Sequence, residues 1–521
     1  MKGYRPFERP DKMGFSYKRS RRLALGHLVL GPYDASGHRA RAGTAVLLPV
    51  LTSLMFSECV ARDSTGTGVP ADAVVIYPGQ NIQAAVDAHP TGTTCLIKGG
   101  VHRLQSVVAK DGDTFVGEQG AILSGAIVLS DFTIEGNVWV ANNQTQGGDP
   151  GPGACQAGYP RCTYPEDLFV DNVPLLHVAS TAALSHGRWF FDYAADKIYL
   201  ADDPTGHTVE TSITRTAITA GPGPNYATGV TVSNLIVEKY ANVAQGGALQ
   251  PAADWVITGV EVRLNHGTGI ALYRAQRAKV INSYIHHNGQ LGIGGSGDGM
   301  LVADNQISYN NTMHYYRGWE AGGGKIVQSR GLLFRHNYCH HNESYGFWLD
   351  GDNIDALIEQ NRFEDNGSAG FVYEISYDAV IRNNTVLRNG LLNPGDWLAS
   401  AGIEIVNSAN VEIYSNLVHD NHEGIAAYDG VRGSGVYGPL EVNNLNVHDN
   451  DVGMVSGFSG LVVDSTVSNL GSFFTTRQNR FEGNRYTLGK ESTYFSWANS
   501  LLTEVQWQGY GQDTTGVFTH Q

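Results

Sequence analysis

One phrase occurs twice in residues 356–390, ALIEQNRFEDNGSAGFVYEISYDAVIRNNTVLRNG, and this repetition identifies the fold class. Each copy has alternating apolar residues, an asparagine, a second asparagine five positions later, and then a glycine. The pairs are Asn361 with Asn366 and Asn384 with Asn389, so the phrase returns after 23 residues. A fixed period of about 20–50 residues is the signature of a repeat architecture, in which each unit packs mainly on its neighbours.

The phrase continues on both sides of this stretch. Further pairs are Asn305 with Asn310, Asn337 with Asn342 and Asn416 with Asn421, and degenerate copies surround Asn265, Asn288 and Asn450. Counted between successive second asparagines, and taking Asn450 as the last, the steps are 22–24 residues with longer ones of 29 and 32. Equal coils with loops inserted on some of them explain both step lengths.

The coils are predicted to consist of short strands. Within each coil apolar and polar residues alternate with period two, and asparagine tolerates the left-handed backbone of a tight turn. The sequence therefore predicts an all-β, right-handed parallel β-helix solenoid. A leucine-rich repeat has a similar period, but it would need leucine at fixed spacing and a helix in each repeat, and neither is seen.

The first part of the chain is predicted to be a targeting segment. A basic run at residues 18–22 (KRSRR) is followed by the apolar run 42–56 (AGTAVLLPVLTSLMF), which is typical of a secretory signal and short for a membrane span. We therefore expect a mature protein that is secreted or periplasmic and not stably inserted in a membrane. Cys155 and Cys162 (CQAGYPRC) either form a local disulfide in such an oxidising compartment or remain two loop thiols.

The flanks of the repeat suggest end caps and one insertion. Asn81 followed by IQAAVDA predicts a short helix with an asparagine N-cap that closes one end of the solenoid. The expected parts are a signal and linker segment (1–72), an N-terminal cap with the first coils (73–126), an inserted β subdomain (127–215), the main coils with an active-site groove (216–480) and a C-terminal cap (481–521).

Charge and composition restrict the partners. The formal net charge is −15, which argues against nucleic acid and mildly against an anionic polymer. No cysteine stands in a CxxC pair, which argues against structural zinc. The expected partner is a neutral polysaccharide or oligosaccharide.

Two acidic residues are the candidate catalytic groups. Counting from the glycine that opens each strand, Gly346 and Gly370, position +1 is apolar and should face the core, so position +4 faces outward. Asp350 and Glu374 both stand at +4 on adjacent coils. Because coils stack at about 4.8 Å, their carboxyl groups should lie roughly 5 Å apart, the spacing of a retaining glycosidase. Two such carboxylates repel, which favours a proton on one of them.

Further residues around this row are predicted to bind substrate. Tryptophan faces can stack on the apolar side of a sugar ring, and polar side chains can hold hydroxyls. The candidates are Trp319, Glu320, Lys325, Trp348, Asp352, Glu404, Tyr428 and Asp429. The competing readings are loop packing for the tryptophans, a Glu320–Lys325 ion pair, and a solvated charged face for the acids.

No cofactor is predicted. Asp350, Asp352 and Asp355 raise the question of calcium, but their spacing misses the EF-hand loop. The sequence therefore predicts no metal site, with calcium as the minor alternative.

Two stretches resemble known carbohydrate-active proteins. WEAGGGK (319–325) through FVYEISYDAVIRNN (371–384) resembles a block found in secreted bacterial β-helix proteins of the pectate-lyase-like superfamily, which act on polysaccharides. GFWLD (346–350) with VYEI (372–375) is similar to the region of β-helix β-xylosidases that carries their catalytic Asp and Glu, although a glycine follows Asp350 here. The resemblance implies that Asp350 is the nucleophile and Glu374 the general acid/base. A fructan-cleaving transferase on the same fold is a related possibility.

Two other functions stay open. The first is a polysaccharide lyase or uronate epimerase, with Lys325 as the base and Arg317 or calcium neutralising the uronate carboxylate. The second is a non-catalytic glycan-binding protein that uses the solenoid as a scaffold. A fold does not choose among these functions, because function depends on the site.

Overall fold

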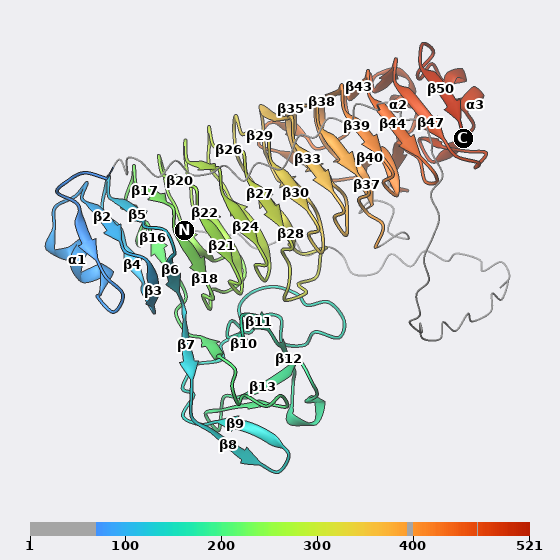
Figure 1. Cartoon of the computed structure of the whole chain (residues 1–521). Coiled ribbons are helices and arrows are strands. Elements are labelled where there is room, and N and C mark those ends of the chain that lie inside the picture. The colour runs from blue at the N-terminus through green and yellow to red at the C-terminus, as the bar shows by residue number, and fades with distance from the viewer. Residues whose placement is uncertain (1–68, 393–399, 466) are drawn as a thin grey trace, which may run out of the picture. The chain divides into compact units, whose positions relative to one another are not determined.

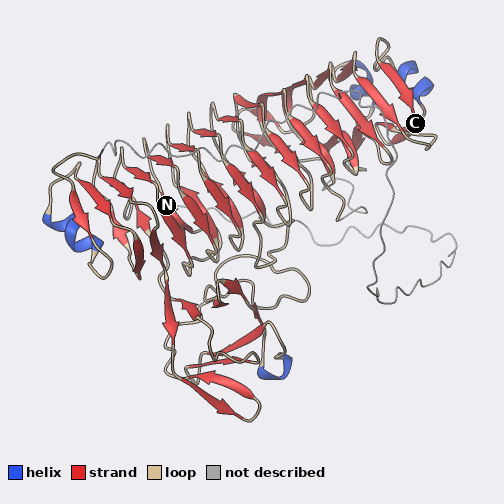
Figure 2. Ribbon diagram, in the orientation of Figure 1, coloured by secondary structure: helices blue, strands red, loops and turns tan. Residues whose placement is uncertain are grey.

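A computed structural model describes residues 69–392, 400–465 and 467–521, so the predicted signal segment lies almost wholly outside the described residues. In the described part, three sheets of 13 strands each run along a solenoid, with one strand per coil in each sheet. Figures 1 and 2 show these strands stacked side by side. Neighbouring strands are parallel, except for the final antiparallel pair β48 and β49. This is the predicted parallel β-helix.

The strands of the three sheets, here called A, B and C, have these bounds. Sheet A contains β1 (Val74–Ile76), β2 (Thr94–Ile97), β5 (Thr114–Gly117), β17 (Thr231–Ser233), β20 (Val256–Thr258), β23 (Lys279–Ile281), β26 (Leu301–Ala303), β29 (Leu333–Arg335), β32 (Ala356–Glu359), β35 (Tyr377–Arg382), β38 (Ala409–Tyr414), β43 (Asn446–His448) and β46 (Arg480–Glu482). Sheet B contains β3 (Gly100–Arg103), β6 (Ala121–Ser124), β18 (Ile236–Glu238), β21 (Glu261–Arg263), β24 (Tyr284–His286), β27 (Gln306–Ser308), β30 (Tyr338–His340), β33 (Arg362–Glu364), β36 (Thr385–Leu387), β39 (Leu417–His419), β44 (Asp451–Met454), β47 (Arg485–Leu488) and β50 (Val517–His520). Sheet C contains β4 (Val107–Val108), β16 (Ile218–Thr219), β19 (Gly247–Gln250), β22 (Thr268–Leu272), β25 (Leu291–Gly295), β28 (Gly322–Ile326), β31 (Phe347–Asp350), β34 (Phe371–Glu374), β37 (Ala401–Val406), β40 (Glu423–Asp429), β45 (Ser459–Val463), β48 (Phe495–Trp497) and β49 (Ser500–Leu502).

The repeated asparagines form two buried ladders at the turns between sheets. In each ladder one side-chain amide donates to the side-chain oxygen of the next coil's asparagine. Asn366, for example, donates to Asn389 at 2.8 Å and to the backbone oxygen of Cys339 at 3.0 Å. These bonds satisfy amide groups that would otherwise be buried without partners, which explains why asparagine recurs at these positions.

The ladders correct one sequence assignment. Asn450 does not follow Asn421; it accepts from Asn416 at 2.9 Å, so it belongs to the ladder of first asparagines. The same ladder continues to Asn484 and ends on Asp513. Coil stacking therefore continues beyond residue 481, where the sequence analysis places the start of the C-terminal cap.

Apolar side chains fill the solenoid, and helices close both ends. At each coil the +1 residue is fully buried, as Phe347, Phe371 and Ile403 show. Helix α1 (Ile82–Ala88) has the predicted N-cap, because the Asn81 side chain accepts from the backbone of Ala84. Helix α3 (Glu504–Gly509) has a capping box and buries a tryptophan in the core, and a short helix α2 (Gly471–Thr475) lies nearby in sequence.

Residues between β6 and β16 form two small sheets outside the coils. Their strands are β7 (Ala126–Leu129), β8 (Phe132–Glu135), β9 (Val138–Ala141), β10 (Leu168–Val170), β11 (Val173–Pro174), β12 (Leu176–His177), β13 (Arg188–Asp192), β14 (Lys197–Leu200) and β15 (Val209–Ser212), with a 3-10 turn at Thr181–Ala183. A further two-stranded sheet joins β41 (Ser434–Gly435) to β42 (Gly438–Pro439) in a later loop.

Buried polar groups hold this insertion against the coils. His266 of a coil lies 3.0 Å from Asp167 and 3.1 Å from the hydroxyl of Tyr315, and all three side chains are buried. Cys155 and Cys162 form a disulfide in the connecting loop, which settles the alternative that the sequence left open. Backbone hydrogen bonds hold this loop next to the long loop that precedes β28: Gln156 donates to the carbonyl of His314 at 2.9 Å, and Tyr316 donates to that of Ala154 at 2.7 Å.

Candidate active site

The candidate site lies on the outer face of sheet C. Strands β28, β31, β34 and β37 are consecutive neighbours there. The register pairs Lys325 with Trp348, and it pairs Asp350 directly with Glu374. Because the residue before each acid, Leu349 or Tyr373, is fully buried in the core, the acidic side chains point outward. The predicted adjacency of the two acids on one face is confirmed.

Lys325 is the centre of the charged groups. Its ammonium lies 2.7 Å from Oδ2 of Asp350, 3.3 Å from Oε1 of Glu320 and 3.8 Å from the ring centre of Trp348. Burial lowers the pKa of Lys325, but the charges of Asp350, Glu320 and Glu374 outweigh burial and raise it above its usual value. Lys325 therefore stays protonated, which is the opposite of what a general base requires.

The carboxylate of Asp350 has two different oxygens. Oδ2 accepts the Lys325 hydrogen bond, whereas Oδ1 is buried and accepts no hydrogen bond from any residue that the structure describes. The side chain as a whole is 19% exposed. The lysine thus orients the carboxylate through one oxygen and leaves the lone pairs of the other uncommitted.

Glu374 faces a second cation that the sequence did not reveal. Nη2 of Arg432 lies 3.6 Å from Oε1 of Glu374. Arg432 belongs to the loop after β40, two coils further along, and the loop is tied back toward the acids. Asp352 accepts from the backbone of Val436 at 2.8 Å, and the hydroxyl of Tyr377 donates to the backbone oxygen of Gly438 at 2.7 Å. The only sequence signal for this loop was the longer spacing between the repeated asparagines at this coil.

Asp352 therefore has a different place from the one predicted. It was expected to bind substrate, but its carboxylate fastens the loop of residues 430–440. The loop in turn carries Arg432 to Glu374.

The predicted tryptophans are less available than expected. Trp348 is only 3% exposed, since Lys325 covers one side of its ring and Tyr345, Ala369 and Val372 pack around it. Stacking of a sugar on Trp348 is therefore wrong for this conformation. Trp319 is half-buried and stacks on Tyr315 beside the disulfide.

The remaining candidates divide into near and distant residues. Glu320 is near, and Gln245 donates to its carboxylate at 2.8 Å. Glu404 is buried at 4% exposure on β37, beside Val372 and one coil beyond Glu374.

Tyr428 and Asp429 lie further along the sheet. Tyr428 stands in the row of Glu374, two coils on, and donates to Asp464 at 2.8 Å. Asp429 is 1% exposed and pairs with Arg477 at 3.0 Å. A substrate-binding role for Asp429 is wrong here, because its charge is buried and already compensated.

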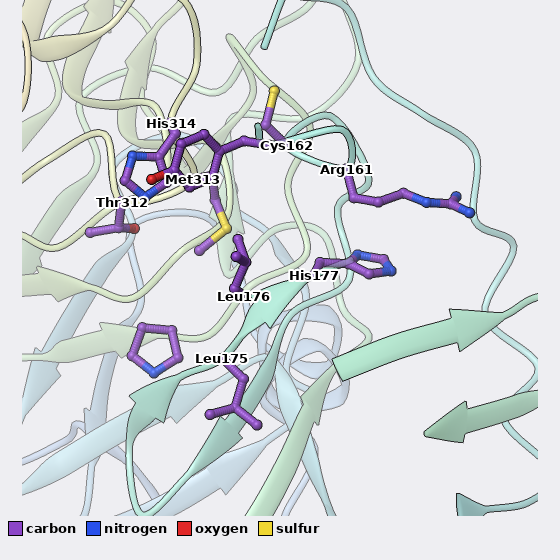
Figure 3. Close-up of a pocket in the computed structure, with 10 residues that line it drawn as sticks. Arg161, Cys162, Leu175, Leu176, His177, Thr312, Met313 and His314 are labelled. Atoms are coloured by element: carbon purple, nitrogen blue, oxygen red, sulfur yellow. The ribbon is translucent and has the colours of Figure 1, made fainter. Parts of the chain in front are cut away.

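A separate cavity lies beside the disulfide loop. It is lined by Tyr159, Leu176, Met313 and His314 among others, and in Figure 3 the ring of His177 points away from Met313 and Leu176. None of the predicted site residues lines it. The insertion thus helps to line a cavity that does not include Asp350 or Glu374.

In residues 69–392, 400–465 and 467–521, no group of three or more His, Cys, Asp or Glu side chains is arranged to hold a metal ion. No helix in this part of the chain is long and apolar enough to cross a bilayer.

Comparison with known proteins agrees with this architecture. Residues 247–400, which include Lys325, Asp350 and Glu374, match the family model described as a right handed beta helix region. The fold is a right-handed parallel β-helix. A comparison with curated protein sequences finds no significant match.

Solved structures share the fold at low sequence identity. The complex of XylC with xylose aligns with a TM-score of 0.61 and 16% identity over 78% of this chain and 80% of that chain. The A-module of the mannuronan C-5 epimerase AlgE6 of Azotobacter vinelandii aligns with a TM-score of 0.49 and 14% identity over 84% and 94% of the two chains. A structure described as a glycoside hydrolase aligns with a TM-score of 0.42 and 10% identity over 62% and 87%. At these identities the alignment with the XylC structure shows a shared fold and nothing more.

Proposed function

We propose that this protein is a retaining glycoside hydrolase that acts on a neutral glycan or oligosaccharide. One observation carries the proposal: Asp350 and Glu374 are register partners on adjacent parallel strands and both point outward. Partner strands lie about 4.8 Å apart, which fits the roughly 5 Å between the carboxyl groups of retaining glycosidases and leaves no room for the water of an inverting one.

The chemistry assigns a separate role to each acid. An oxygen of Asp350 attacks the anomeric carbon while Glu374 gives its proton to the glycosidic oxygen, so the carbon–oxygen bond breaks and a glycosyl ester of Asp350 forms. Water then attacks the anomeric carbon and gives its proton to Glu374, and the ester bond to Asp350 breaks. Two inversions leave the configuration of the sugar unchanged.

The neighbouring cations fit these roles. Lys325 donates to Oδ2 of Asp350 at 2.7 Å and thereby orients the carboxylate that acts as the nucleophile. Its raised pKa keeps it charged throughout the neutral range. Arg432 lies against Glu374 and helps to fix the direction of that carboxyl.

The same contacts count against the lyase or epimerase alternative. A lyase needs a neutral base near the acidic carbon, and Lys325 is held in its charged form by two carboxylates. A binding-only role makes no use of two carboxylates placed side by side, whose repulsion costs stability. Export from the cytoplasm is part of the proposal, since the Cys155–Cys162 disulfide fits an oxidising compartment.

Hydrolysis with analysis of the product tests the proposal. The first substrates are p-nitrophenyl β-xyloside and xylotriose, because the similar XylC structure holds xylose, followed by glycosides of other neutral sugars. D350N and E374Q should each lower kcat/KM at least about a thousandfold. E412Q, a change at an exposed glutamate of sheet A, is the matched control and should retain activity.

The stereochemistry gives a second, independent readout. Nuclear magnetic resonance of the first-formed sugar should show the anomeric configuration of the substrate. An inverted product, full activity in D350N, or no hydrolysis of any neutral glycoside by the wild type would refute the proposal. Binding of a glycan without turnover would favour the scaffold alternative, and ultraviolet absorbance from an unsaturated uronate would favour the lyase.

A further inference from the structure

The row of side chains that contains Asp350 and Glu374 continues toward the N-terminal end of sheet C. Four successive strands of this sheet have as register partners Leu272, Gly295, Ile326 and Leu349. The residues that directly follow these partners are, in the same order, Tyr273, Ser296, Val327 and Asp350. Leu272, Ile326 and Leu349 are buried in the core, so the residues that follow them point outward. Tyr273 is accordingly 40% exposed. It lies in line with the acids, three coils away, which is about 14 Å at about 4.8 Å per coil.

A pocket opens at this end of the row. It is lined by Thr219, Tyr226, Gln250, Tyr273 and residues 220–223. Tyr226 comes from the loop after β16, whereas Gln250 and Tyr273 come from the next two coils of sheet C. The pocket is therefore built by three successive coils of the sheet that carries the acids.

The polar groups of the pocket are held in place. The Gln250 amide donates to the backbone oxygen of Gly247 at 3.2 Å, and the Thr219 hydroxyl donates to the Gln250 oxygen at 3.2 Å. The Tyr273 hydroxyl donates to the backbone oxygen of Gln245 at 3.3 Å, which fixes its ring. Rigid aromatic and polar groups bind a ligand at a lower entropy cost than mobile ones.

The chemistry of the lining selects an uncharged ligand. No charged side chain lines this pocket in the described residues. Phenol rings offer apolar faces to the CH groups of a sugar, and amide, hydroxyl and backbone groups can exchange hydrogen bonds with its hydroxyls. A carboxylate-bearing sugar would be buried there without a counter-charge.

We propose that the pocket of Tyr226 and Tyr273 is a second sugar-binding site, which holds a distal unit of a neutral glycan chain whose scissile bond lies at Asp350 and Glu374. The proposal rests on the proposed function for the polarity of the substrate, and it adds that the chain runs along the solenoid axis. A substrate of one or two sugars cannot span about three coils, so the pocket contributes to the binding of longer chains only.

Binding without turnover tests the pocket directly. D350N protein is titrated with xylotetraose, cellotetraose and trigalacturonate, and binding is followed by isothermal titration calorimetry. In the D350N background, Y273A and Y226A should each weaken binding of the better neutral tetrasaccharide about tenfold, the effect of about 1.4 kcal/mol of lost stacking. Y309A is the matched control, because Tyr309 is also 40% exposed but follows β27 in sheet B. It should leave binding unchanged.

Each outcome of the titration decides the proposal. Equal loss in Y309A, no loss in Y273A and Y226A, tighter binding of trigalacturonate, or no binding of either neutral tetrasaccharide would overturn it. Circular dichroism of each variant should match that of the parent, which separates lost binding from lost folding.

Hydrolysis distinguishes this proposal from the proposed function. In the otherwise wild-type enzyme, Y273A should raise KM for the tetrasaccharide about tenfold and leave kcat/KM for p-nitrophenyl β-xyloside unchanged. Hydrolysis without any effect of the tyrosines would remove the second site alone. Tyrosine-dependent binding without hydrolysis by the wild type would remove the catalytic proposal alone.

Discussion

Lys325 provides the sharpest test of the charge arrangement. The variant K325M keeps an unbranched apolar side chain of similar length in the same space and removes the ammonium. The side chain of Lys325 is 9% exposed, and it contacts Asp350 at 2.7 Å, Glu320 at 3.3 Å and the face of Trp348 at 3.8 Å. Loss of the ammonium leaves the carboxylates of Asp350 and Glu320 with little solvent and without the cation that they share.

The expected cost follows from that burial. Removing one member of a buried, hydrogen-bonded ion pair typically costs about 3–5 kcal/mol, and we expect about 3 kcal/mol because Asp350 is 19% exposed. In the K325M protein, Asp350 repels Glu320 and Glu374. D350N should therefore destabilise the wild type but stabilise K325M, with a coupling energy of about 2 kcal/mol.

A double-mutant cycle measures this coupling. Unfolding in urea, which leaves ion pairs unscreened, is followed by fluorescence and circular dichroism, and coincident curves justify a free energy of unfolding. The Lys98–Glu118 pair is the control, since it has a separation of 2.6 Å but side chains that are 28% and 44% exposed, and its cycle should show no measurable coupling. If D350N has the same effect with Lys325 and with Met at that position, the reasoning is refuted.

The pH dependence of this coupling has a definite sign. Because the pKa of Lys325 is raised in the folded protein, its stabilising contribution is complete below the unfolded-state pKa and is lost only as the pH rises through the higher folded-state pKa. The cycle should therefore give the same coupling energy at about pH 7 and about pH 9. A coupling that disappears between these values would show that Lys325 loses its proton there.

Three further predictions concern the scaffold. N366A should lower the free energy of unfolding by about 4 kcal/mol, because the side chain makes four buried hydrogen bonds within its ladder; urea unfolding measures it. C155S/C162S should cost about 2 kcal/mol of local stability, the value for a short closed loop, and limited proteolysis should then cut the loop near residue 158. The hydrogen bond from Arg362 outweighs burial and lowers the pKa of Glu364 to about 2. The stabilisation that ionised Glu364 contributes is therefore present above about pH 4.5 and is lost as the pH falls toward 2. R362Q should flatten the acid unfolding curve over that range.

One experimental result would contradict each of these three predictions. N446A removes one solvent-exposed hydrogen bond, from Arg480 to a half-buried asparagine, and should cost far less than N366A. Equal costs would refute the ladder argument. Cleavage of the double cysteine variant at the wild-type rate would show that the disulfide does not hold the loop. Parallel acid unfolding curves for R362Q and the wild type would show that Arg362 is not the cause of the low pKa.

Local chemistry along the chain made much of this protein predictable. The 23-residue spacing of Asn361 and Asn384 identifies a coil, because only asparagine both turns the chain and bonds to its own copy in the next coil. Once the coil is known, alternation places Phe347 inward and Asp350 outward. Equal counts from Gly346 and Gly370 then bring Asp350 and Glu374 together. The ladder position of Asn450 was mistaken because a loop changes the count within its coil.

The surroundings of the two acids depend on contacts between distant segments. Arg432 reaches Glu374 only because Asp352 and Tyr377 fasten the loop that carries it. Arg477 neutralises Asp429 across 48 positions of the chain, a pairing that no local pattern reports.

Sequence by itself thus determined the repeat, the inward and outward faces and the row in which the acids stand, since these follow from a short period and the alternation of side chains in a strand. The charges that surround that row, the deep burial of Trp348 and the place where the row of Asp350 meets the pocket at Tyr273 all depend on tertiary contacts. The physical reason is that a solenoid determines stacking between neighbouring coils through local periodicity, whereas its inserted loops have no period, and their paths depend on which buried groups they satisfy.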